Sequence, residues 1–147
     1  LITHSWEGGH EDHDACNLIA RKAALKNKIL TKSFEFYLYN SYKTRLIFFR
    51  VFNPLTKNGK KVKSKLLERF LFISLLFTYK SQYKIWIGLY PFIIFHYLFN
   101  GYNFLSKLQK TFKLTKPHKG KLLYEKRKFC KFKDFKIKTK LFISDIK

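Results

Sequence analysis

Histidines and acids gather near the start of the 147-residue chain. The stretch SWEGGHEDHDAC (5–16) holds two of the five histidines and four of the nine acids. Two residues separate His10 from His13, a spacing that can turn both rings toward one pocket at the start of a helix. The other three histidines, His4 among them, show no ligand-like spacing to this pair. The spacing alone leaves two alternatives open, a metal site and a solvated, acid-capped turn.

A strand, a loop and a helix are expected to position these side chains. Residues 1–3 are apolar and end directly at the polar, glycine-containing stretch, which predicts the last residues of a buried strand. From Asp14 onward, apolar residues recur near the helical period. Asp12 or Asp14 is available as the cap of that helix. The predicted order is therefore strand, loop, helix.

Hydrophobic periodicity and turn residues divide the middle of the chain. Alternating or continuous apolar runs indicate strands, Pro and Asn-Gly indicate a loop, and broad apolar faces indicate helices. The second of these helices contains Pro91, where a bend is expected. The pattern predicts strands at 34–40 and 45–52, a loop at 53–61, and helices at 62–80 and 83–99.

The C-terminal tail allows two interpretations. In residues 126–143 lysines alternate with apolar residues, which fits a lysine-rich edge strand. The spacing of Phe129, Phe132 and Phe135 also suits a helix. We expect one domain over 1–147, whose segments are 1–30 (helix and histidine cluster), 31–61 (strands and loop), 62–110 (aromatic helices) and 111–147 (basic segment).

The net charge of +22 is unevenly distributed. Residues 1–20 carry −4, from four acids and no Lys or Arg, and residues 21–147 carry +26. A basic body suggests nucleic acid or an anionic membrane as a partner. However, 26 of the 31 basic residues are Lys, and the chain has no known nucleic-acid reader motif. The composition therefore argues against a nucleic-acid partner.

Two apolar runs, 70–79 and 85–99, bear on a membrane contact. Each is shorter than the roughly 18–20 residues of a spanning helix. Lysines around them, Lys80, Lys84 and Lys107, leave an interfacial contact with an anionic membrane open. The two cysteines are far apart and outside any CxxC spacing, which suits a reducing cytoplasm. The expected location is cytoplasmic, with membrane association as an alternative.

The histidine cluster resembles a known signature. THSWEGGHEDHDA (3–15) resembles the second signature of the PIG-L/LmbE-like N-acetylglucosaminyl deacetylases, a Thr-containing strand end followed by Glu-Gly-Gly-His-Pro-Asp-His-Asp-Ala. Within that core only Glu11 departs, because it stands where the family has Pro. YKSQ (79–82) and KPHKGKLLYE (116–125) are similar to later elements of the same family, in the same order.

This resemblance implies roles for three residues of the cluster. His13 would be a zinc ligand. His10 would sit beside the metal and stabilise the oxyanion or protonate the leaving amine. Asp12 would hydrogen-bond to the neighbouring histidine and orient it.

The resemblance also implies a substrate pocket. Glu7, Gly8 and Gly9 would shape the loop at its rim, where glycines let the backbone approach the substrate closely. His118 would either return near the pocket through the C-terminal loop or be an ordinary surface histidine. The substrate implied is an N-acetylated amino sugar or a similar small conjugate.

The family's other signature, Ala-His-Pro-Asp-Asp-Glu, supplies the remaining ligands and the general base, and this chain does not contain it. We therefore expect a fragment, in agreement with an initial Leu and no Met. The implied fold is an α/β, Rossmann-like layered sandwich, of which this chain is the C-terminal part. The implied parent protein is a zinc-dependent deacetylase, inactive as these residues alone. The alternative is a basic module that binds a membrane surface or another anionic ligand without catalysis.

Overall fold

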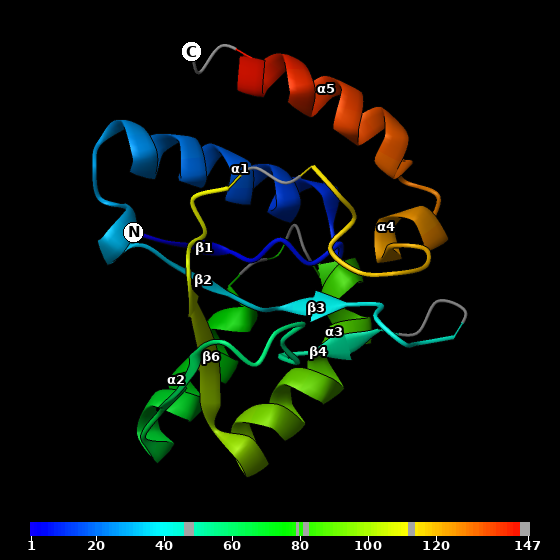
Figure 1. Ribbon diagram of the computed structural model, residues 1–147. Helices are drawn as coiled ribbons and strands as arrows, with labels where there is room; N and C mark the ends of the chain where they lie inside the picture. Colours follow the sequence, from blue (N-terminus) through cyan, green and yellow to red (C-terminus); the bar gives the residue numbers. More distant parts are fainter. Residues whose placement is uncertain (46–48, 79, 81–82, 112–113, 145–147) are drawn as a thin grey trace.

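The structure, a computed structural model, describes residues 1–45, 49–78, 80, 83–111 and 114–144 (Figure 1). Its elements follow one another as β1 (Ile2–His4), α1 (Glu11–Lys26), η1 (Leu30–Lys32), β2 (Phe34–Phe36), β3 (Tyr39–Asn40), β4 (Arg50–Val51), β5 (Lys60–Lys63), α2 (Leu66–Leu76), α3 (Tyr83–Phe95), the π-turn η3 (His96–Asn100), β6 (Tyr102–Lys107), α4 (Leu123–Lys126) and α5 (Phe132–Ser144).

A mixed four-stranded sheet organises the fold, in the order β1-β2-β6-β5. β1 and β2 are parallel, with Thr3 opposite Glu35, and α1 forms the crossover that parallel neighbours need. β6 is antiparallel to both β2 and β5. β3 and β4 form a separate antiparallel pair. The predicted α/β class is confirmed at this level, as a mixed sheet with helices.

The helices gather on two sides of the sheet. Figure 1 shows α1 and α5 together at one end of the molecule and α2 and α3 at the other. A core beside α1 and α5 contains Leu18, Leu122, Tyr124, Phe132 and Phe135. A second core, against α3, contains Tyr39, Phe52, Leu89, Ile93, Tyr97 and Leu123. Because Leu122 and Leu123 belong to different cores, the start of α4 joins the two halves.

The N-terminal elements confirm the predicted order of strand, loop and helix, but β1 is an edge strand with Leu1 and Ile2 exposed, so the predicted buried strand is wrong on that point. The helix, however, begins at Glu11, and its N-cap is His10 instead of either aspartate. The single strand predicted at 34–40 is interrupted, so that β2 and β3 pair with different partners. Of the strand predicted at 45–52 only β4 is observed, and residues 46–48 lie outside the described part.

Two strands lie where helices were predicted. β5 replaces the start of the helix expected at 62–80, and β6 ends the segment 62–110 that was expected to be helical. Strand pairing accounts for both, because β5 and β6 pair with each other and β6 also pairs with β2. The helix predicted at 83–99 is confirmed, with Pro91 inside α3 and a π-turn after it.

The tail is a helix, so the lysine-rich edge strand is wrong. In α5, Phe132, Phe135 and Thr139 are buried at helical spacing, and the lysines between them stay largely on the outside. The Lys22 ammonium lies over the Phe142 ring, 4.2 Å from its centroid, and ties α5 to α1. No helix of the described residues has the length and apolarity needed to cross a membrane.

Candidate functional site

The candidate site lies at the carboxyl ends of the two parallel strands. His4 ends β1 and stands opposite Phe36, which ends β2. In open α/β sheets ligands bind at this edge, because loops from neighbouring strands leave the sheet there. The loop after β1 leads directly into α1, which starts at Glu11. Strand end, loop and first helical turn therefore place the cluster at one edge of the sheet.

Three histidine rings meet at this edge. His4 and His13 stack with ring centroids 3.9 Å apart and planes 3° from parallel. His10 lies 5.5 Å from His13, and Tyr39 meets the His13 ring edge-on at 5.4 Å. The structure thus brings together the predicted pair and adds a third histidine that the spacing did not indicate.

The site favours a neutral His13. Burial lowers its pKa to about 3, and repulsion from His4 and His10 contributes. Burial also lowers the pKa of His4. Among the described residues, the buried Nδ1 atoms of His4 and His13 have no hydrogen-bond partner. A neutral imidazole with a buried, unpartnered nitrogen has the chemistry that a zinc ligand requires.

His10 caps α1 with its side chain. Its Nδ1 accepts the Asp12 backbone N–H at 3.2 Å, so in the neutral ring the proton is on Nε2. The Asp12 carboxylate is 3.7 Å from the same Nδ1 and largely exposed. Asp12 therefore bonds to the His10 ring through its backbone N–H, while its carboxylate only lies nearby. The capping role predicted for Asp12 or Asp14 is corrected, because His10 fills that position.

Asp14 is completely buried beneath the loop. One of its carboxylate oxygens accepts the backbone N–H groups of Glu7 and Gly8, each at 3.1 Å. Burial raises the pKa of Asp14 to about 7, against the lowering effect of these hydrogen bonds. Asp14 thus fixes the loop backbone immediately before the histidines.

Glu7 is also completely buried, and its predicted role of shaping the loop at the rim of a pocket stays a prediction. Its Oε1 accepts the backbone N–H groups of Leu38 at 2.8 Å and Tyr39 at 3.1 Å, and its Oε2 accepts the Asn40 side-chain N–H at 3.2 Å. Burial raises the pKa of Glu7 to about 8 even though these three donors lower it. Glu7 therefore ties the loop after β1 to the segment after β2.

Gly8 and Gly9 allow the loop to close against the rest of the protein. A Cβ on Gly9 would clash with the Tyr39 carbonyl oxygen. Gly8 has φ +71°, and a Cβ there would come within 2.7 Å of the Leu122 side chain. In the structure these glycines allow close approach to β3 and to the segment before α4, and the predicted close approach to substrate stays a prediction.

His118 returns toward the loop, so its interpretation as an ordinary surface histidine is wrong. It is buried, its Nδ1 donates to the Lys119 carbonyl at 2.9 Å, and its ring contacts Tyr42. The neighbouring Pro117 side chain is within 3.1 Å of a Cβ placed on Gly8. The segment 116–125 therefore packs on the glycine loop.

Polar side chains beneath His4 support it, and sequence reasoning missed them. Asn17 donates from its side chain to the His4 carbonyl at 2.6 Å and to Glu35 at 2.9 Å. Arg21 lies 3.6 Å from the same Glu35 carboxylate. The signal available in the sequence was the helical spacing of Asp14, Asn17 and Arg21, polar residues on what is otherwise a buried face.

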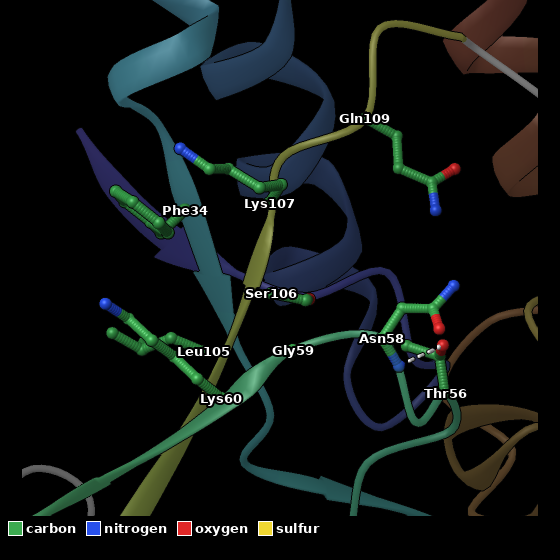
Figure 2. Close-up of a pocket in the computed structure, with 9 residues that line it drawn as sticks. All are labelled: Phe34, Thr56, Asn58, Gly59, Lys60, Leu105, Ser106, Lys107 and Gln109. Atoms are coloured by element: carbon green, nitrogen blue, oxygen red, sulfur yellow. Dashed lines mark hydrogen bonds between the residues drawn. The ribbon is translucent and has the colours of Figure 1, made fainter.

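A separate hollow of about 590 Å³ lies against β6. Figure 2 shows Asn58, Thr56 and Gln109 on one side of β6 and the lysine side chains on the other. The Lys107 ammonium is already bound to the Thr31 carbonyl. None of the predicted site residues lines this hollow.

Among the described residues no three His, Cys, Asp or Glu side chains form a group that could hold a metal ion. The YKSQ stretch, similar to a family element, lies largely outside the described residues. Searches against models of protein families, against curated proteins and against solved structures found no match.

Substitution of Gly9 tests the close packing of the loop against Tyr39. Gly9→Ala should destabilise the fold by about 3 kcal/mol, because the new methyl group would overlap the Tyr39 carbonyl. Gly88→Ala is the matched control. Gly88 lies in α3 with open space around it, so alanine should stabilise by roughly 0.5–1 kcal/mol. Urea unfolding measures both, and equal effects at the two positions would contradict the packing role of Gly9.

The buried carboxyl groups predict a pH dependence of stability. Glu7 has a folded-state pKa of about 8 against an ordinary 4.5, so the folded state holds more protons between these values. The free energy of unfolding should therefore fall as pH rises toward 8, most clearly above pH 7, where His13 is largely neutral both folded and unfolded. Asp14 adds to this fall up to about pH 7.

Glu7→Gln should remove most of the fall above pH 7, since glutamine does not titrate. Asp134→Asn, which removes an exposed carboxyl group in α5, should leave it unchanged. Urea unfolding at several pH values measures the slope. An unchanged slope in Glu7→Gln would show that the carboxyl group is ionised in the folded protein throughout this range.

Proposed function

We propose that these residues are part of a zinc-dependent deacetylase of the PIG-L/LmbE-like kind. Its substrate would be an N-acetylated amino sugar or a similar small conjugate. The observation that carries the proposal is the buried, neutral His13, with an unpartnered Nδ1 and His10 beside it. The spacing of the EGGHEDHDA signature and the packing of segment 116–125 on its glycine loop support the same conclusion.

The residues present fit one side of a zinc site. His13 would be the ligand contributed by this chain, because its imidazole is neutral and its buried nitrogen is unpartnered. A catalytic zinc typically takes three protein ligands. The remaining ligands and the general base would come from the Ala-His-Pro-Asp-Asp-Glu signature, which these residues do not contain.

Amide hydrolysis needs an activated water and positive charge where the oxyanion develops, and bound zinc would supply both. His10 would assist from beside the metal. With Nδ1 accepting the Asp12 N–H, its Nε2–H could donate a hydrogen bond to the oxyanion. To give a proton to the departing amine, His10 would first have to be an imidazolium, which returns to the neutral ring when it loses that proton. The nearby Asp12 carboxylate would stabilise the ring whenever it carries a positive charge.

The loop would hold His10 and His13 in place. Glu7 would contribute to this from the interior and would not contact the substrate. Glu7 and Asp14 fix the backbone on either side of the glycines, so the positions of His10 and His13 follow from buried hydrogen bonds. His118, from the segment that covers the loop, would face the substrate side. The complete domain would be a Rossmann-like sandwich, and the parallel β1-α1-β2 unit supports this fold. Its location would be the cytoplasm.

Zinc binding tests the ligand assignment. The chain should bind zinc only weakly, because it supplies one of the three protein ligands, and His13→Ala should remove this weak binding because it removes that ligand. His10→Asn is the matched control, since asparagine is a good N-cap and His10 is not a ligand in this proposal. Calorimetric titration of zinc measures all three proteins, with circular dichroism to check folding. An unchanged zinc affinity in folded His13→Ala would overturn the assignment.

Activity tests the incompleteness of the site. The 147 residues with zinc should not hydrolyse N-acetylglucosamine conjugates, because the general base is absent from them. The genomic sequence upstream of the Leu1 codon should encode, in frame, a strand followed by a His-Pro-Asp-Asp run. Metal-dependent turnover by the 147 residues alone would contradict the incomplete site, and an immediate upstream stop codon would indicate a remnant.

A further inference from the structure

An apolar surface covers the end of the molecule that carries α2 and α3. No residue of α2 is buried, and Leu67 at its start is 82% exposed. The exposed large apolar side chains of this helix and its C-cap are Leu66, Leu67, Phe70, Leu71, Leu75 and Phe77. Monomeric soluble proteins rarely leave a contiguous apolar surface of this kind open unless something binds it.

The second helix adds an aromatic stripe. Leu89, Ile93 and Tyr97 face the core, while Phe92, Phe95 and Phe99 are exposed at helical spacing on another face. Phe95 and Phe99 stack on each other, 5.7 Å between ring centroids. Phe77, at the end of α2, contacts Tyr90 of α3, so the two exposed sets belong to adjoining helices. Figure 1 shows both helices at the end of the molecule away from α5.

Lysines lie next to this surface. Residues 60–100 contain six Lys and one Arg against a single acid, Glu68. Glu68 is already engaged, because its carboxylate accepts the Lys65 backbone N–H at the start of α2. Exposed lysines in β5, before α2 and after it are Lys60, Lys61, Lys63, Lys65 and Lys80. The surface is thus an apolar centre with a positive border.

We infer that this surface docks on an anionic lipid bilayer. The apolar side chains of α2 and α3 would enter the boundary between headgroups and acyl chains, and the bordering lysines would bind the anionic headgroups. α2 has 11 residues, about 16 Å, which is too short to cross the roughly 30 Å hydrocarbon core and suits a helix that lies along the interface. A second copy of the chain fits less well, since it would bring the same lysines against these.

Vesicle sedimentation of the full chain tests this surface. The chain should pellet with vesicles of phosphatidylcholine and phosphatidylserine, less with phosphatidylcholine alone, and less at high salt. The double variant Phe95→Ser with Phe99→Ser should lower binding at least about tenfold, because two exposed aromatic rings no longer enter the bilayer. Ile19→Ser with Ile137→Ser, at exposed apolar positions of α1 and α5, is the matched control and should bind as the natural chain does.

Charge reversal separates the lysine border from the general basic charge. Lys63→Glu with Lys65→Glu should lower binding to anionic vesicles at least about tenfold, and Lys133→Glu with Lys138→Glu, exposed in α5, should lower it less. All these positions are exposed, so folding should persist and circular dichroism checks it. Equal losses from both pairs, or a chain that stays in the supernatant, would overturn the inference.

Two further measurements identify the occupant. If a second copy covered this surface, sedimentation velocity would show a dimer that Phe95→Ser with Phe99→Ser dissociates, and vesicle binding would be absent. The inference does not depend on zinc chemistry, since His13→Ala should bind vesicles as the natural chain does. If His13→Ala loses zinc binding and still binds vesicles, the two proposals are shown to concern separate sites, and each is judged by its own measurement.

Discussion

The carboxyl group of Glu7 joins three parts of the molecule that are distant in the sequence. It accepts N–H groups from the segment after β2, while its own backbone is held by Asp14 of α1. An ionised carboxylate at this depth is costly, and three donors offset only part of that cost, as its raised pKa indicates. Every position in the histidine cluster depends on this arrangement, because His10 and His13 continue directly from the loop that Glu7 and Asp14 secure.

These buried acids also bear on one of the two initial interpretations of the cluster, the solvated, acid-capped turn. A solvated, acid-capped turn would expose its carboxylates, and Asp12 alone does so to a large extent. Glu7 and Asp14 are inside, with raised pKa values, and the cap is a histidine. The acidic character of the first 20 residues is therefore mainly an internal feature, while the positive charge of the body stays on the surface.

Local signals in the sequence predicted the parts that depend on neighbours along the chain. The strand, loop and helix of residues 1–26 and the helix containing Pro91 follow from periodicity and turn residues, and the structure has them. β6 was missed because its pairing with β2 and β5 is non-local, and a six-residue strand after an aromatic helix has no distinct period. The stacking of His4 on His13 was missed for the same reason, since it depends on how the strand end meets the helix start in space.

The core against α3 connects the two ends of the molecule. Ile93 and Leu89 pack with Tyr39, and the Tyr39 ring contacts His13, while Phe92 and Phe95 on the same helix face outward. A close-packed interior transmits displacement because its side chains have little room to adjust. The position of the Tyr39 ring beside His13 therefore depends on the packing of α3, a helix far along the chain, and periodicity in the sequence does not indicate that dependence.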